Sequence, residues 1–205
     1  IMAVVSGGTT LIDNGALDPA VPSGNLTLLS TQTASSSATL DFTSGIDSTY
    51  DSYVFKFINI HPSSDKQKFQ FNLSTDGGSN YNVAKTTTSF DSLHNESDTS
   101  TQLAYKTGQD LAQGTGFQEL EQELGNGNDE SGCGYLHLYD PANTSKVKHF
   151  MATTTYHQTF GQLGSFQVYY GGYGNTTSAV NAVQFKMSSG NIDSGLIKLY
   201  GVKPS

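Results

Sequence analysis

Hydrophobic and polar residues alternate one by one along much of the chain. In residues 52–60, Tyr53, Phe55 and Phe57 fall on one side, and residues 68–73 repeat the pattern. Successive side chains of a strand point to opposite faces, so this period predicts strands with one buried face. Only the turn at 62–65 separates the two segments, which predicts that they pair as an antiparallel hairpin.

Similar segments recur every 10 to 15 residues or so, separated by turns rich in Gly, Asn, Asp and Ser. A second hairpin is predicted from 134–140 and 146–156, around the turn DPANTS. The total is nine or ten strands, with no helices alternating between them. This pattern predicts an all-β fold, an antiparallel β-sandwich with jelly-roll topology. The other predicted strands are 25–33, 37–42, 103–106, 165–170, 181–187 and 195–201.

The middle of the chain, residues 81–130, is less regular. Its polar run TTTSFDSLHNESDTSTQ predicts a long loop before the short strand near Leu103. The segment QELEQELG (118–125) has Leu120 and Leu124 four residues apart, which fits one or two helical turns. It alternates poorly as a strand, and its structure is left open.

Residues 1–24 differ from the rest, because the apolar IMAVV is followed by closely spaced turn signals. We predict an extended N-terminal arm before a single β-sandwich domain at 25–205. A short strand from Met2 to Val5 would pair with a sheet edge or with a neighbouring subunit; a frayed terminus is the alternative. The expected arm contacts are Met2, Val4, Val5, Leu11 and Ile12.

Composition narrows the possible functions. All ten basic residues are Lys, and the formal net charge is -8. Arg makes the forked contacts to phosphate and guanine, and a net negative chain is repelled by a phosphate backbone, so no nucleic-acid partner is expected. No run of 18 apolar residues occurs, so no membrane span is expected. The 11 Tyr and 11 Phe supply a core and argue against disorder.

No catalytic signature is present in the sequence. The motifs G-x-S-x-G, H-E-x-x-H and the phosphate-binding glycine loops are all missing. Glu119, Glu121 and Glu123 would share one face of a strand, where a solvated rim is a more ordinary role than a glycosidase pair. We therefore predict that the protein is not an enzyme and needs no cofactor. If it were a polysaccharide depolymerase, Glu119, Glu121 and Asp129 would be the acids to test.

Metal and thiol sites are weak possibilities. His137 and His149 lie in the two arms of the predicted second hairpin and could face each other, but a metal would need a third ligand. Ordinary hydrogen-bonded histidines are expected instead. Cys133, the only cysteine, is expected to be a small buried residue rather than a reactive thiol.

Two turns, 76–80 and 126–130, gather oxygen-bearing side chains that calcium could use. Asp, Asn and Gly also favour ordinary turns, and the turn interpretation is preferred.

The stretch YYGGYG (169–174) is the candidate recognition loop. Exposed tyrosines at a sandwich edge stack on sugar rings and are common in protein interfaces. The recognition residues would be Tyr169, Tyr170 and Tyr173. Alternatively, some of these tyrosines complete the core and the glycines form a turn.

Several strings in the chain resemble small virion structural proteins of tailed bacteriophages, especially those of marine bacteria. The resemblance runs from about residue 28 to the end and implies a jelly-roll-like virion protein, with no catalytic residues. The strings are SGIDSTYDSY (44–53), FINIHP (57–62), VKHF (147–150), QFKMSSGN (184–191) and LIKLYG (196–201).

The resulting hypothesis is a capsid decoration or cement protein, assembled in the host cytoplasm and located on the virion. It would act as a homotrimer and bind other virion proteins, the major capsid protein or tail proteins, through the arm. The alternative is a tail fibre or adhesin domain that recognises host glycans.

Overall fold

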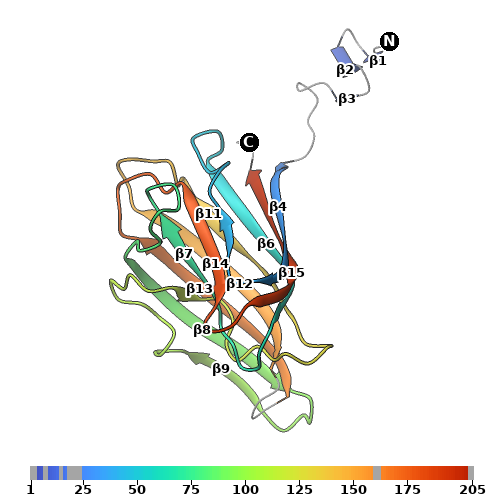
Figure 1. Ribbon diagram of the computed structural model, residues 1–205, viewed down its shortest axis with the longest axis vertical. Coiled ribbons are helices and arrows are strands. Elements are labelled where there is room, and N and C mark those ends of the chain that lie inside the picture. The colour runs from blue at the N-terminus through green and yellow to red at the C-terminus, as the bar shows by residue number, and fades with distance from the viewer. Residues whose placement is uncertain (1–3, 7–8, 14–15, 18–24, 159–162, 203–205) are drawn as a thin grey trace.

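The protein is described by a computed structural model, which covers residues 4–6, 9–13, 16–17, 25–158 and 163–202. Within residues 25–202 all regular elements are strands, twelve in number, and no helix occurs in the described residues (Figure 1). They are β4 (Leu26–Ser37), β5 (Leu40–Phe42), β6 (Ser52–Pro62), β7 (Phe69–Ser74), β8 (Lys85–Asn95), β9 (Thr101–Tyr105), β10 (Gln118–Glu119), β11 (Gly132–Tyr139), β12 (Lys148–Gln158), β13 (Gly164–Gly174), β14 (Ala182–Met187) and β15 (Ile192–Val202).

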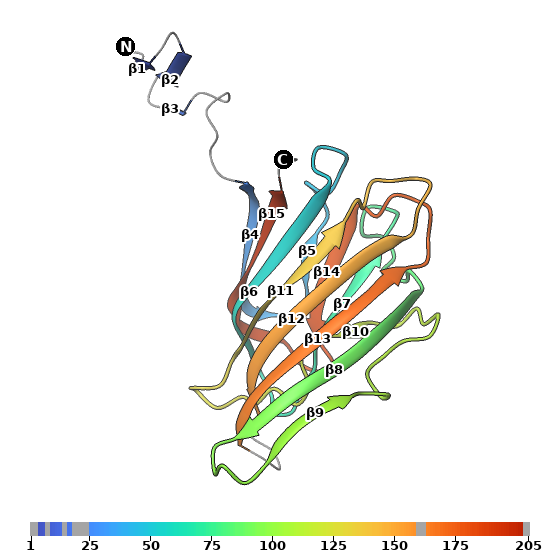
Figure 2. The same ribbon diagram turned by 180° about the vertical axis from the view of Figure 1, so that it is seen from behind.

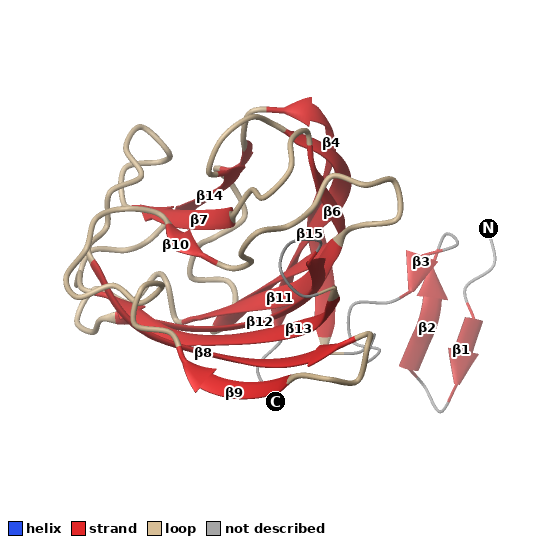
Figure 3. Ribbon diagram, turned by 90° about the horizontal axis from the view of Figure 1, so that it is seen from below, coloured by secondary structure: helices blue, strands red, loops and turns tan. Residues whose placement is uncertain are grey.

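These strands form two antiparallel sheets of unequal size. The small sheet has the order β10-β7-β14-β5, and the large sheet has the order β4-β15-β6-β11-β12-β13-β8-β9. The large sheet curves around the small one (Figure 3), while Figure 2 shows its outer side. The predicted antiparallel β-sandwich is confirmed. In the large sheet β11, β12 and β13 are consecutive neighbours, and the jelly-roll topology stays a prediction.

The predicted alternation of buried and more exposed side chains along β6 is confirmed. Tyr53, Phe55 and Phe57 are buried, whereas Lys56 is exposed. The predicted pairing of β6 with β7 is wrong, because β7 belongs to the small sheet and pairs with β10 and β14. The two phenylalanine-rich segments face each other across the sandwich instead. The second predicted hairpin, β11 with β12, is confirmed by its register.

Phe185 on β14 lies at the centre of the contact between the sheets. Its ring packs against rings from both sheets, at centroid distances of 5.3 Å to Phe55 and Phe57 and 5.8 Å to Phe69. These tilted, edge-on and stacked ring pairs add attraction beyond the burial of apolar area. This aromatic cluster therefore fixes how the two sheets pack.

The small sheet covers only part of the inner face of the large one. Beyond β10, the inner face of β8, β12 and β13 is covered by the irregular segment 106–130, in which Leu120 and Leu124 are fully buried. No helical turn forms at 118–125: two residues make β10 and bends follow.

The long loop expected after residue 85 is wrong, because β8 is an eleven-residue strand there. Its inward side chains include Thr87, Ser89 and Asp91, all buried. A strand with polar residues on both faces has no hydrophobic period, so it could not be recognised from the pattern. The short strand predicted near Leu103 is confirmed as β9.

Three short strands occur before residue 25: β1 (Val4–Ser6), β2 (Thr9–Asp13) and β3 (Ala16–Leu17). They pair with each other in an antiparallel sheet, with Val4 opposite Ile12 and Ile12 opposite Leu17. The segment thus contains a small sheet of its own, and pairing of this segment with a neighbouring subunit stays a prediction. Met2 lies outside the described residues.

We expect Phe185→Ala to lower the free energy of unfolding by about 3–5 kcal/mol, because it removes a ring that packs against both sheets. Urea denaturation followed by circular dichroism measures this change. Leu103→Ala is the control, since that side chain is 76% exposed and its loss should change stability by less than about 0.5 kcal/mol. Equal effects of the two substitutions would contradict the central role of Phe185.

Candidate functional site

The outer side of the large sheet carries the most distinctive surface of the described residues. We define the outer face as the outward-pointing positions of strands β8, β9, β11, β12 and β13. By the register these positions are Thr86, Thr88, Phe90, Ser92 and His94; Thr101, Leu103 and Tyr105; Cys133, Tyr135, His137 and Tyr139; His149, Met151, Thr153, Thr155 and His157; Ser165, Gln167, Tyr169, Gly171 and Tyr173.

An aromatic row crosses five strands of this face. The register places Tyr135 opposite Thr153, Thr153 opposite Tyr169, Tyr169 opposite Phe90, and Phe90 opposite Tyr105. The rings of Phe90 and Tyr169 stack with centroids 4.8 Å apart. Phe90, Tyr135 and Tyr105 are 43%, 47% and 52% exposed, so large apolar surfaces stay open to solvent. Contiguous exposure of this kind marks interaction sites.

The outer face is also electrically neutral apart from its histidines. None of its positions holds Asp, Glu or Lys, although the whole chain has a net charge of -8. The charged residues of these strands, Lys85, Asp91 and Lys148, occupy inward positions and are buried. Depletion of charge together with enrichment in tyrosine and phenylalanine is typical of the centre of a binding surface.

A hollow of about 470 Å³ lies on the outer face above Gly171. A side chain at Gly171 would meet only the Thr88 hydroxyl, 3.6 Å away, so the absence of a side chain leaves the floor open. Tyr139, Met151 and Tyr173 are among the residues that line the hollow. The hollow therefore combines apolar walls with nearby hydroxyl groups.

The candidate recognition residues do not form a loop, because residues 169–174 are part of strand β13. Tyr169 and Tyr173 lie on the outer face, where the ring centroids of Tyr173 and His149 are 6.0 Å apart. Tyr170 points into the core and is 2% exposed, and burial raises the pKa of its hydroxyl. Only two of the three predicted residues can therefore touch a partner.

The two histidines of the β11–β12 hairpin do not face each other. His137 lies opposite Met151 and its Nε2 is 3.1 Å from the Ser52 hydroxyl, while His149 contacts Tyr173. Partial burial lowers the pKa of His137. Among the described residues no group of three His, Cys, Asp or Glu side chains is placed to hold a metal ion.

The prediction of a buried Cys133 is wrong, because the residue is partly exposed. Its Sγ accepts a hydrogen bond from the Asn59 backbone at 3.3 Å. It lines a second hollow, of about 550 Å³, at the end of the outer face. His157 also lines this hollow, and it pairs with Glu96 and Glu130 at 3.2 and 3.5 Å.

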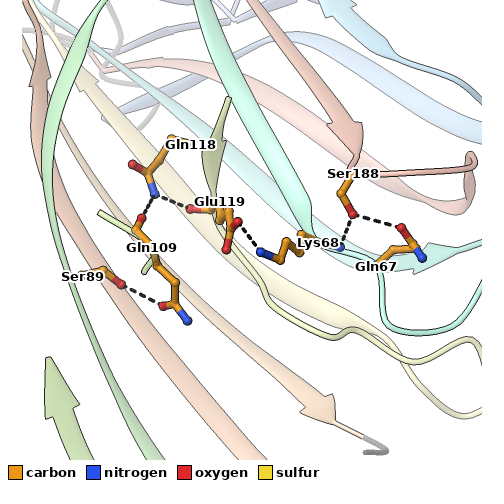
Figure 4. A network of polar contacts seen from close by, with 7 residues as sticks. All are labelled: Gln67, Lys68, Ser89, Gln109, Gln118, Glu119 and Ser188. Atoms are coloured by element: carbon orange, nitrogen blue, oxygen red, sulfur yellow. Dashed lines mark hydrogen bonds and ion pairs between the residues drawn. The ribbon is translucent and has the colours of Figure 1, made fainter. Parts of the chain in front are cut away.

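The acidic run is not the solvated rim that the sequence favours. Glu119 forms an ion pair with Lys68 at 2.6 Å, within a network that also holds Gln118 and Gln109 (Figure 4). Glu121 is fully buried, and neither of its carboxyl oxygens has a hydrogen-bond partner among the described residues. Its carboxyl group lies where a side chain of residue 132 would be, which requires Gly132. Burial raises the pKa of Glu121 well above its usual value and so favours the uncharged acid.

The two candidate calcium turns are organised by their own hydrogen bonds. Asp76 accepts bonds from the Asn80 backbone and side chain and from the Ser74 hydroxyl, which lowers the pKa of Asp76 to about 2. Gly77 and Gly78 have positive φ angles of 72° and 92° there. In the second turn, Glu130 accepts a bond from the Gly127 backbone at 2.7 Å. Both arrangements agree with the preferred turn interpretation.

Sequence reasoning missed Phe90, Tyr105 and Tyr135 as surface residues. Tyr135 could have been found from the alternation of residues 134–140, in which Leu136 and Leu138 form the buried face. Phe90 and Tyr105 could not, because their alignment with Tyr169 depends on the pairing of β8 with β13.

Comparison with known proteins gives no relative: no family model, no curated protein and no solved structure matches the chain. Among the described residues, no helix is long and apolar enough to cross a membrane.

We expect stability to fall as the pH rises above about 4.5, the usual pKa of a glutamic acid, because the unfolded chain then ionises Glu121 while the folded protein keeps it protonated. Glu121→Gln should remove this contribution, at most about 1.4 kcal/mol per pH unit, and gain stability relative to the wild type as the pH rises. Urea unfolding at about pH 5 and pH 7 measures the difference.

Asp129→Asn, which changes an exposed carboxyl in the same segment, is the matched control and should keep the wild-type dependence. If Glu121→Gln shows the same pH dependence as the wild type, Glu121 is not buried as described.

Proposed function

We propose that this chain is a non-enzymatic structural protein of a tailed-bacteriophage particle, a capsid decoration protein that docks through its outer face. The observation that carries the proposal is the neutral aromatic row from Tyr135 to Tyr105. Burying such a surface against a partner costs little desolvation free energy, because few charged groups have to leave water. The strings that resemble phage virion proteins give the partner class: the major capsid protein or tail proteins.

A non-enzymatic role is supported by what surrounds the reactive side chains. Of the three acids named for a depolymerase, Glu119 is paired with Lys68, Glu121 is enclosed without access to a substrate, and Asp129 is exposed. A glycosidase needs two carboxyl groups that flank a bound sugar, and two of these three acids are engaged or enclosed instead.

The predicted homotrimer and the attachment through residues 1–24 remain part of the proposal. The three strands β1, β2 and β3 give this segment regular backbone structure of its own. Val4, Val5, Leu11 and Ile12 lie within these strands. In the proposed particle, this segment adds a second contact to that made by the outer face, so that the two together raise the affinity.

We expect the double substitution Phe90→Ser and Tyr169→Ser to weaken binding to particles stripped of this chain by about tenfold or more, since it removes the stacked pair at the centre of the row. Co-sedimentation measures bound protein, and circular dichroism checks folding. Leu28→Ser is the control, because it removes an apolar side chain of similar exposure on the far edge strand β4. A variant that lacks residues 1–24 measures how much the arm contributes to particle binding, independently of the outer face.

Loss of binding only on deletion of residues 1–24, with the double variant at full affinity, would overturn docking through the outer face. Full binding by both variants would overturn the decoration proposal altogether.

A second candidate function is recognition of host glycans as part of a tail fibre or adhesin. The hollow above Gly171 favours it, since tyrosine walls and threonine hydroxyls suit the apolar and polar sides of a sugar ring.

If the hollow binds glycans, a glycan array should show selective binding by the wild type and its loss in Tyr173→Ala. Tyr200→Ala is the control, because Tyr200 lies on β15, away from the hollow. No glycan bound by the wild type would eliminate this second function and leave the decoration proposal unaffected.

A further inference from the structure

Two lysines, Lys85 and Lys148, are completely buried between the sheets. A buried ammonium group is costly unless a charge or several hydrogen bonds compensate it. Among the described residues, the Lys148 amino group hydrogen-bonds to the backbone oxygens of Lys146 and Thr176. The Lys85 amino group differs, because it reaches a side-chain amide.

The contact joins the two sheets. Lys85 is the first residue of β8 in the large sheet, and Asn72 lies on β7 in the small sheet. Lys85 Nζ lies 2.5 Å from Asn72 Oδ1 and 2.8 Å from the Val83 carbonyl oxygen. The amino group is therefore in contact with the amide whose carbon it would attack.

The Asn72 amide is held in one orientation by its other hydrogen bonds. Its Nδ2 donates to the carbonyl oxygens of Tyr81 and Thr115 at 2.6 and 3.0 Å. Its Oδ1 accepts a bond from the Leu73 backbone N–H at 2.9 Å. A fixed donor at Oδ1 stabilises negative charge that develops on this oxygen during attack at the amide carbon.

We propose that Lys85 and Asn72 form an intramolecular isopeptide bond that links β8 to β7 covalently. The site is a modification site for the chain itself and is independent of the proposed function.

The reaction balances without any oxidant or co-reactant. Neutral Lys85 Nζ attacks Asn72 Cγ, and the electron pair of the C=O bond moves to Oδ1 in a tetrahedral intermediate. A proton passes from Nζ to Nδ2, the Cγ–Nδ2 bond breaks, and ammonia leaves as the C=O bond reforms. The new Cγ–Nζ bond replaces the broken Cγ–Nδ2 bond, and the product amide is neutral, as the Asn72 amide was.

Burial supplies the reactive form of the nucleophile. Desolvation lowers the pKa of Lys85 to about 7, so a large share of the amine is uncharged near neutral pH. Closeness and fixed orientation replace the entropy cost of bringing the two groups together. Within the described part of the chain, the hydrogen-bond partners of Lys85 Nζ are the Asn72 amide and the Val83 carbonyl. The proton therefore passes directly between the two nitrogens, and bond formation is expected to be slow.

The test is the intact mass of the wild-type protein under denaturing conditions, followed over days of incubation near neutral pH. We expect a time-dependent loss of about 17 Da, the mass of ammonia. Trypsin should then fail to cut after Lys85 and release residues 69–106 as one peptide carrying the loss. Cleavage after Lys148 should be normal, which makes this second buried lysine the internal control.

Lys85→Met and Asn72→Ala should each abolish the loss of ammonia. Retention of the loss in Lys85→Met would overturn the proposal, because it would indicate a succinimide at Asn72 instead. A wild-type mass that stays at the full sequence value, with normal cleavage after Lys85, would overturn it equally, whether or not the variants fold.

Discussion

Contact between two sheets of unequal size is the constraint on which the rest of this structure depends. The sheets are held together by an aromatic cluster around Phe185. The Phe185 ring packs against Phe55 and Phe57 of β6 and against Phe69 of β7. Burial of large apolar rings is the dominant stabilising term in such a core. Four strands cannot cover eight, so the aromatic cluster ends before the large sheet does.

Beyond that cluster, buried polar groups lie among apolar side chains such as Leu120 and Val168. Under the segment 106–130 the inner face of β8 carries Thr87, Ser89 and Asp91, and Glu121 is enclosed nearby with its carboxyl group unbonded. Because alternation turns the charged residues of β8 and β12 inward, the opposite side of the same strands is left neutral. The buried polar side chains of β8 and the aromatic outer face are thus two consequences of one strand register.

The sequence allowed the sandwich to be predicted wherever apolar residues alternate, as they do from Tyr53 to Phe57 and from Leu136 to Leu138. Pairing was harder, since β6 and β7 have equivalent patterns yet belong to different sheets. Strand β8 could not be found because its buried side is polar, and the aromatic row needed β8 in register with β13. Burial of Glu121 was hidden for a similar reason, since a carboxyl in a polar-looking run gives no sign of enclosure.

Cryo-electron microscopy of the purified phage particle tests the central claim, docking through the outer face, most directly. The account predicts density for this chain on the capsid, with strands β8, β12 and β13 turned toward a neighbouring virion protein and Phe90 and Tyr169 within the contact. Density in which the outer face is open to solvent and another surface makes the attachment would contradict it.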